Sequence, residues 1–237
     1  MNSTVVVSPS KLRADYSRLL RKLAIGDDKY IITSSVIRVE NPLQENQNSY
    51  QFDLVENSSS DRPLEEKLNR NDLFAITHIR IGITRQDESV NPAQYGNFKL
   101  FTTNDANFFT GTNEANALAN IYNGTLTVKT DNVERLQRLN TNLFEYIPER
   151  GYIIANAPQV ADEFPMSGPT LEERGYFYMQ PQIILSGDQS NILTVNLGTG
   201  DTTGIAGAGP QTNVLVCELF GYQVNNAVQP SLRVKVF

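Results

Sequence analysis

The stretch that decides the fold of this 237-residue chain is Leu73-Phe74-Ala75-Ile76-Thr77-His78-Ile79-Arg80-Ile81-Gly82-Ile83-Thr84-Arg85. Apolar and polar residues alternate through most of it, and β-branched side chains dominate. A period of two predicts a β-strand rather than a helix. Side chains two positions apart in a strand share a face. We therefore expect His78 on the same face as Phe74, Ile76 and Arg80.

The same period of two continues through most of the chain beyond residue 29. Breaks such as Asn41-Pro42 and the polar run 57–61 separate the apolar runs. We predict strands at residues 30–40, 50–55, 73–85, 98–103, 124–130, 152–155, 176–185, 191–197, 213–224 and 231–237. Many strands without a βαβ rhythm predict an all-β protein, an antiparallel sandwich of jelly-roll or Greek-key type. The strand number favours one elaborated jelly roll, and a compact double jelly roll divided near residues 110–150 is the alternative.

Two short helices are expected inside this body. Residues 114–121 are alanine-rich and end at Asn123-Gly124. Residues 131–139 begin with Asp131 and Glu134 in the spacing of a capping box, and Val133, Leu136 and Leu139 recur at helical intervals. Short helices of this kind commonly lie in the loops of β-sandwiches.

We predict that the N-terminal residues 1–29 form a separate arm and that residues 30–237 form the β body. Within the arm we predict an amphipathic helix over residues 8–25, with Ser8 as its N-cap and Gly26 as its stop. Residues 1–30 carry six basic and three acidic side chains, net +3, which leaves 14 basic and 23 acidic side chains, net −9, in the rest. The apolar stripe of this helix consists of Leu12, Tyr16, Leu19, Leu20 and Leu23.

Two interpretations of the arm stay open. The helix either packs on its own domain as an ordinary surface helix, or it faces phosphate groups of lipid or of packaged nucleic acid. The candidates for that phosphate or lipid contact are the basic residues Lys11, Arg13, Arg18, Arg21 and Lys22.

The chain contains few of the residues on which enzymes depend. It has one histidine, His78, one cysteine, Cys217, and no tryptophan. Catalytic triads need a histidine, and zinc sites need several His and Cys ligands. A mid-strand His78 is expected to be a packed or interface side chain, and Cys217, within an apolar run, a buried one. We therefore expect no enzymatic activity, metal, cofactor or small-molecule substrate.

Three weaker signals point to other functions. The acidic pairs Asp27-Asp28, Glu65-Glu66, Asp87-Glu88 and Glu172-Glu173 leave a carboxylate enzyme open, although a glycosidase needs carboxylates that face each other across a sugar. The glycine-rich stretch 198–210 lacks the Gly-Lys-Ser/Thr of a phosphate-binding loop and is expected to join two strands. Aromatic residues at 176–178 suggest a sugar-stacking ladder, and the nearby Pro181 indicates an edge strand or a bulge.

In the runs Asn71–Thr77, Ile121–Val128, Gln182–Gly187 and Phe220–Tyr222, the chain resembles structural proteins of phages that infect Bacteroidetes-type bacteria. In particular, the chain resembles the jelly-roll capsid proteins of tailless, lipid-containing icosahedral bacteriophages of the Finnlakeviridae kind. The resemblance implies a shell protein without enzymatic activity that stands on an internal membrane and associates as trimers or at fivefold vertices. In that family the major shell protein is a double jelly roll and the vertex protein a single one.

These observations predict a structural virion protein, a coat subunit that self-assembles into an icosahedral shell with its N-terminal helix facing the interior. Its partners would be copies of itself, other capsid proteins and the membrane lipid or nucleic acid beneath. The chain shows no secretory signal, so we expect it to be made in the host cytoplasm and to reside in the virion. The alternative function is a carbohydrate- or receptor-binding β-sandwich module.

Overall fold

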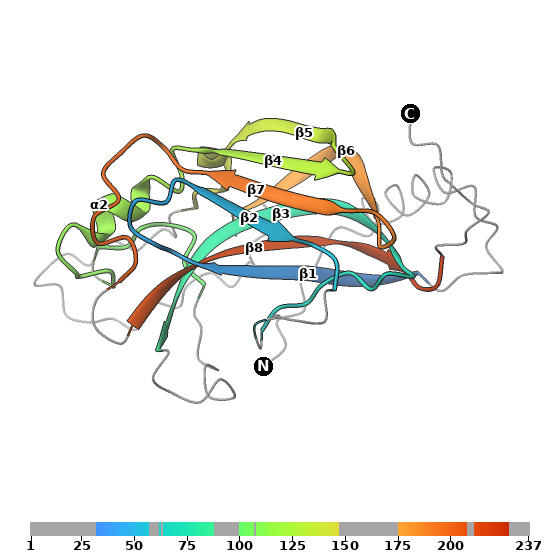
Figure 1. The fold of residues 1–237 in the computed structure, drawn as a ribbon, viewed down its shortest axis with the longest axis horizontal. Helices are drawn as coiled ribbons and strands as arrows, with labels where there is room; N and C mark the ends of the chain where they lie inside the picture. The colour runs from blue at the N-terminus through green and yellow to red at the C-terminus, as the bar shows by residue number, and fades with distance from the viewer. Residues whose placement is uncertain are drawn as a thin grey trace, which may run out of the picture.

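In the part of the chain that the structure describes, eight strands form two antiparallel sheets that pack face to face (Figure 1). The computed structural model describes residues 32–56, 62, 64–87, 100–106, 108–146, 175–207 and 211–227. A short helix, α2 (Glu114–Ala119), and one 3-10 turn, η2 (Thr141–Phe144), lie in the connections. The expectation of an all-β antiparallel sandwich is confirmed. The strands are β1 (Ile32–Pro42), β2 (Ser49–Asp53), β3 (Leu73–Asp87), β4 (Thr125–Thr130), β5 (Val133–Asn140), β6 (Tyr176–Ser186), β7 (Asn191–Asn196) and β8 (Gln211–Val224).

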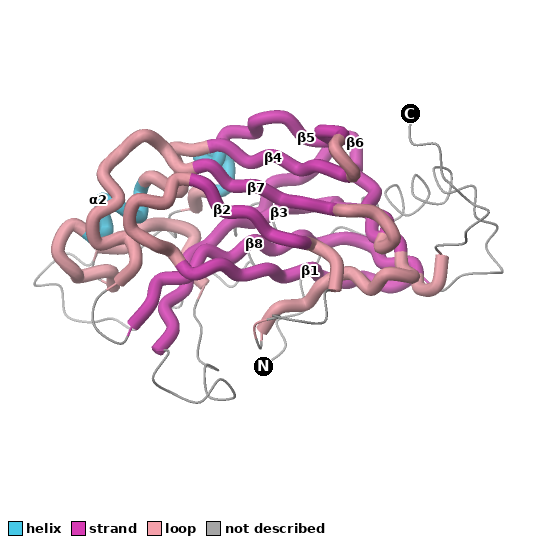
Figure 2. Tube along the Cα trace, in the orientation of Figure 1, coloured by secondary structure: helices cyan, strands magenta, loops and turns pink. Residues whose placement is uncertain are grey.

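The strands pair in a nested order. Sheet A has the order β1-β8-β3-β6, and sheet B has the order β2-β7-β4-β5. Thus β1 pairs with β8, β2 with β7, β3 with β6 and β4 with β5, all antiparallel. Every connection passes from one sheet to the other except the β4–β5 hairpin, and Figure 2 shows the loops gathered at the two ends of the layers. The chain is arranged as a long hairpin of strand pairs rolled into two layers.

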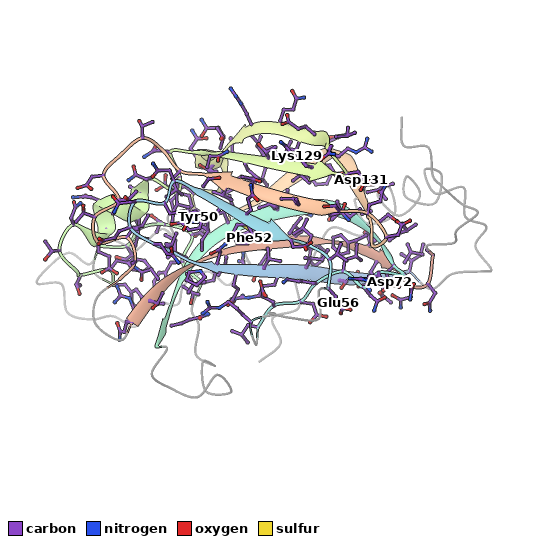
Figure 3. The ribbon with its side chains drawn as sticks, in the orientation of Figure 1. Tyr50, Phe52, Glu56, Asp72, Lys129 and Asp131 are labelled. Atoms are coloured by element: carbon purple, nitrogen blue, oxygen red, sulfur yellow. The ribbon has the colours of Figure 1, made fainter. Side chains whose placement is uncertain are left out.

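One hydrophobic core fills the space between the sheets, and all eight strands contribute apolar side chains to it. Tyr50 and Phe52 of β2, labelled in Figure 3, are buried there. Leu118 and Tyr122, in and just after α2, pack into the same core. Cys217 is fully buried in it, as predicted, and burial raises the pKa of its thiol. This single core extends over both sheets.

A β-bulge at Thr77 interrupts the ladder between β3 and β8. Ile76 pairs with Gly221 and His78 pairs with Phe220, so Thr77 is an extra residue on β3. A β-carbon on Gly221 would lie 2.0 Å from the carbonyl oxygen of Ala75. The strands therefore approach so closely beside the bulge that a larger residue does not fit at position 221.

The bulge reverses which side chains of β3 face the core. An extra residue moves every later side chain to the opposite face. The prediction that His78 and Arg80 share a face with Phe74 and Ile76 is therefore wrong, because a uniform period of two takes no account of the bulge. The core side chains of β3 are Phe74 and Ile76 before the bulge and Ile79, Ile81 and Ile83 after it.

The predicted helix at residues 131–139 is also wrong. Asp131 and Asn132 form a two-residue hairpin turn between β4 and β5, and both have positive φ, at 49° and 36°. Positive φ at both central residues is the geometry of a type I′ turn, which Asn and Asp tolerate better than most residues. Turn chemistry at these two positions thus overrides the capping-box spacing.

Bulges in β5 explain the helix-like spacing of its leucines. Leu139 pairs with Leu126 and Leu136 with Val128, so three steps along β5 correspond to two along β4. Arg138, between the two leucines, has a φ of 45°. Leu136 and Leu139 consequently both pack against the core although they are three residues apart.

The remaining sequence predictions have mixed outcomes. The helix at 114–121 is confirmed as α2. Of the strand predicted at 98–103, the described residues 100–103 form a single bridge, between Phe101 and Ile83. The proline prediction is confirmed: β6 is an edge strand of sheet A, and its register shifts between Tyr178 and Ile183. The predicted helix at 8–25 and the strands at 152–155 and 231–237 lie outside the described residues.

The β4–β5 turn gives a direct test of this geometry. Asn132→Gly should raise stability by up to about 1 kcal/mol, because glycine adopts positive φ without strain. Asn132→Val should lower it by about 1–2 kcal/mol, because a β-branched residue is strained there. Thermal unfolding of the two variants measures both effects. A helix at 131–139 would reverse this order, since glycine weakens helices more than valine does.

Candidate functional surface

The outer face of sheet A, which points away from the core, is largely buried along its two central strands, β3 and β8, although it is not part of the core. Thr84 and Gln86 of β3 and Val216 and Glu218 of β8 lie on it, and all four are buried. The outer face of sheet B differs, because Gln51, Asp53 and Lys129 are exposed there. The two sheets therefore have different surroundings, because the central strands of sheet A are buried on both faces.

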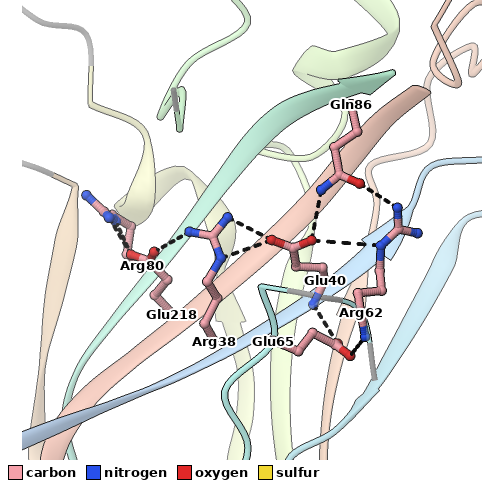
Figure 4. Close-up of polar contacts among 7 residues, drawn as sticks. All are labelled: Arg38, Glu40, Arg62, Glu65, Arg80, Gln86 and Glu218. Atoms are coloured by element: carbon pink, nitrogen blue, oxygen red, sulfur yellow. Dashed lines mark hydrogen bonds and ion pairs between the residues drawn. The ribbon is translucent and has the colours of Figure 1, made fainter. Parts of the chain in front are cut away.

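Glu218 is the centre of a charge network on this outer face (Figure 4). Its Oε1 accepts a hydrogen bond from Nη1 of Arg38 at 2.9 Å. Its Oε2 accepts from Nε of Arg80 at 2.9 Å and from the hydroxyl of Tyr176 at 3.0 Å. The Arg80 guanidinium also lies 4.3 Å from the centre of the Tyr176 ring. One carboxylate therefore joins β1, β3, β6 and β8 across the whole sheet.

Glu40 extends the network along β1. Its Oε1 accepts from Nη2 of Arg38 at 2.7 Å, and its Oε2 accepts from Nε2 of Gln86 at 2.9 Å. Nε of Arg62 lies 3.8 Å from the same Oε2. Arg62 also donates to Oε1 of Gln86 (Figure 4).

The segment around residue 65 lies against β1 and closes the network. Oε1 of Glu65 accepts from the backbone amide of Glu40 at 3.0 Å, and its Oε2 accepts from the amide of Arg62 at 2.8 Å. The backbones of Arg38 and Glu66 exchange two hydrogen bonds, each 2.8 Å long. This pairing also satisfies part of the edge of β1, an edge that would otherwise be open to another strand.

The burial of these groups determines what the network contributes. The Glu40 and Glu218 side chains are 1% and 9% exposed, and those of Arg38 and Arg80 about a fifth. Buried ion pairs add little net stability because desolvation offsets their attraction, but removing one partner leaves an uncompensated charge. We infer that the network fixes the register of sheet A and the position of the segment around residue 65.

His78 lies beside this network in an aromatic cluster. Its ring centre is 5.1 Å from that of Tyr178 and 6.1 Å from that of Phe220. The Thr77 hydroxyl donates to the Phe220 carbonyl at 3.0 Å, and Nδ1 of His78 lies 3.0 Å from the oxygen of the same hydroxyl. His78 is thus the packed, buried side chain that the sequence predicted.

The aromatic ladder of β6 is divided between the two faces of sheet A. Phe177 and Met179 pack against the core. Tyr176 is buried on the outer face, where it binds Glu218. This arrangement does not present a row of exposed rings on which a sugar could stack.

At the α2 end, Glu114 holds the helix to both central strands of sheet A. Its carboxylate accepts from Nδ2 of Asn213 at 2.6 Å and from the amide of Gly111 at 2.7 Å, and it is paired with Arg85. Burial alone would raise the pKa of this carboxyl, but the hydrogen bonds and the Arg85 charge outweigh burial and lower it. Glu114 is therefore a structural anion that sequence reasoning did not single out.

The glycine-rich stretch joins β7 to β8, as predicted, and is packed on α2. Asn120 donates from Nδ2 to the carbonyl of Asp201 at 2.8 Å, and Oε1 of Glu45 accepts from the amide of Gly204 at 2.8 Å. Ile205 is fully buried in the core. The described part of this stretch, residues 198–207, is thus anchored at both the helix and the β1–β2 loop.

At the end of the sandwich opposite α2, Asp131 joins the β4–β5 and β6–β7 turns. Asp131, labelled in Figure 3, accepts from Nε2 of Gln189 at 2.9 Å and from the amide of Ser190 at 3.1 Å. In the described part of the chain, His, Cys, Asp and Glu form no group of three that could hold a metal ion. A small polar hollow lies at the same end of the sandwich. It has a volume of about 320 Å³ and is lined by Asp53, Val55, Arg70, Gly187, Asp188, Gln189 and Ser190.

The basic residues predicted to contact phosphate, Lys11, Arg13, Arg18, Arg21 and Lys22, lie outside the described residues. Of the predicted acidic pairs, Glu65-Glu66 has a structural role. The Glu65 carboxylate belongs to the charge network, and the backbone of Glu66 exchanges hydrogen bonds with the backbone of Arg38. Among the described helices, none has the length and apolar character to cross a membrane.

Comparison with protein-family models, curated proteins and solved structures finds no match for this chain.

The network makes a quantitative prediction. Glu218→Gln should destabilise the protein by about 2 kcal/mol, less than a fully buried pair would cost, because the arginines keep some contact with water. The matched control is Glu134→Gln, which removes an exposed pair with Lys129 and should change stability by no more than about 0.5 kcal/mol. Chemical denaturation compares the two variants. Equal effects would show that the outer-face network does not constrain sheet A.

Proposed function

We propose that this chain is a coat subunit of a small icosahedral phage, a structural protein that self-assembles into a shell. The observation that carries the proposal is the nested pairing of eight strands in two four-stranded sheets. An eight-stranded double-sheet sandwich built from two Greek keys is a jelly roll, an architecture found in viral capsid proteins. The order β1-β8-β3-β6 over β2-β7-β4-β5 fits a single jelly roll, and its one shared core favours this over two.

A jelly roll alone does not determine function, because lectin domains share it. A sugar-binding module needs accessible aromatic rings or convergent polar groups. The ladder of β6, the main support for that alternative, is divided between the core and the buried charge network. The resemblance of the sequence to phage capsid proteins supports the coat function.

The surfaces of the sandwich suit repeated weak contacts between copies. The outer face of sheet B is exposed and carries uncharged polar side chains such as Ser49 and Gln51 beside the charged Asp53, Lys129 and Glu134. The loops at the α2 end are joined to one another by Asn113, Asn120 and Glu45. A rigid body with polar, weakly charged faces can bury modest areas against several neighbours, and closed symmetry adds these contacts together.

Within this proposal the N-terminal arm supplies the contact with the interior. The arm carries a net charge of +3 and the body a net charge of −9. Anionic lipid or packaged nucleic acid would attract the arm and repel the body. The residues proposed for this contact are Lys11, Arg13, Arg18, Arg21 and Lys22.

Removing the arm tests this function. A chain lacking residues 1–25 should keep a folded β body but assemble poorly, and the full chain should form large symmetric particles under electron microscopy. As a matched control, glutamine at all five basic positions keeps the apolar stripe and should permit assembly, with at least tenfold less nucleic acid or lipid bound per particle. A full chain that remains a monomer and binds specific glycans on an array would refute the coat proposal. Normal, loaded particles from the truncated chain would refute the role of the arm.

A further inference from the structure

An apolar band crosses the outer face of sheet A at the end where β1 begins. Ile32 pairs with Val224, and Val224 pairs with Leu73, so the band runs across neighbouring strands. Ala75 pairs with Tyr222 on one side and with Ile184 on the other. The band thus reaches from one edge of the four-stranded sheet to the other. Its members are Ile32, Leu73, Ala75, Ile184, Tyr222, Val224 and Ala227.

The band is buried on the two central strands and partly buried at its edge members, Ile32 and Ile184, and this burial requires a second layer. Val224 is fully buried and Ala75 is 1% exposed, although both point away from the core. In the described part of the chain, the apolar members of this cluster are residues of sheet A and Ala227, which lies just after β8. A sheet does not bury its own face, so another segment must cover the band.

We propose that the N-terminal amphipathic helix, residues 8–25 of the same chain, is the layer that covers this band. The first support is its position. The N-terminal segment enters the sheet at Ile32, which is itself a member of the band. When fully extended, residues 26–31 span about 20 Å between the end of the helix and Ile32. This length is enough for the helix to fold back over the sheet.

The dimensions of the helix match those of the band. Four strands are about 14 Å across, because neighbouring strands lie about 4.8 Å apart. The apolar stripe from Leu12 to Leu23 is about 16 Å long at 1.5 Å per residue. One side of the helix therefore supplies apolar side chains along the full width of the band.

The C-terminal residues 228–237 are the competing occupant, since they leave the sheet at Ala227. Their apolar residues alternate with a period of two, which predicts a strand. A lone strand laid flat on a sheet face leaves its backbone donors and acceptors unpaired, whereas a helix satisfies its own. The helix is therefore the better cover for a buried apolar face.

This docking orients the charges of the helix. With Leu12, Leu19 and Leu23 against the band, the basic side chains on the other faces of the helix point away from sheet A. The sheet A side of the subunit then presents a cationic surface to anionic groups, while the exposed outer face of sheet B points the opposite way. The docking itself does not depend on the coat function, because it concerns the isolated subunit.

Thiol protection tests the docking in the full chain. Ala75→Cys places a thiol in the middle of the band, and the native Cys217 remains as an internal reference that reacts only when the core unfolds. Labelling with a maleimide followed by mass spectrometry should modify the introduced thiol at least tenfold more slowly in the full chain than in the chain lacking residues 1–25. Equal rates in the two proteins, with Cys217 unreactive in both, would overturn the proposal.

Further variants separate the possible covers. Leu19→Glu with Leu20→Glu should expose the introduced thiol as truncation does, whereas the matched change Arg18→Gln with Arg21→Gln should leave it protected. Exposure on deleting residues 228–237, but not on deleting residues 1–25, would assign the cover to the C-terminal segment and refute the helix. Protection that is independent of protein concentration supports docking within one chain. Protection lost on dilution contradicts it, because a neighbouring copy would then supply the helix.

Discussion

The extra residue at Thr77 is the constraint on which the rest of the structure depends. It lies in β3, a central strand of sheet A, and it moves every later side chain of that strand to the opposite face. Three isoleucines then enter the core, while His78 and Arg80 move to the outer face. Because Gly221 lets the partner strand approach closely at this point, the bulge is built into both strands.

This arrangement gives the central strands of sheet A two buried faces. On the core side it packs against sheet B, and on the outer side it carries a charge network at one end and an apolar band at the other. Glu218 is within reach of Arg80 because the bulge places Arg80 on the outer face. Sheet B has one buried face and one exposed polar face. The sandwich therefore has two unlike sides, which supports the proposed coat function because the interior and exterior of a shell differ.

The sequence predicts the parts of the fold that follow a regular period. Most strands and α2 appear close to where their patterns place them, because alternation and alanine-rich helical segments are local signals. Bulges are not local in this sense. The three-residue spacing of Leu136 and Leu139 imitates a helix because β5 contains extra residues. Nothing in the spacing itself distinguishes the two cases.

The charge network was beyond the reach of sequence reasoning for a related reason. Arg38 and Arg80 bind a glutamate that lies 180 and 138 residues further along the chain. A single charged residue in an apolar strand, such as Glu218 between Cys217 and Leu219, was the one available signal, since a buried carboxylate needs partners. Which arginines would meet it depends on the nested strand order and on the bulge.

Deletion of Thr77 tests this central claim most directly, with deletion of Arg138 as the control, because both remove the extra residue of a bulge. Without Thr77, a regular ladder would force either His78 and Arg80 into the core or Phe74 and Ile76 out of it, so the protein should lose its cooperative thermal unfolding transition. Deleting Arg138 affects the last residues of an edge strand and should leave a cooperative transition at a lower midpoint. A Thr77 deletion that unfolds cooperatively at the wild-type midpoint would contradict the proposed role of the bulge.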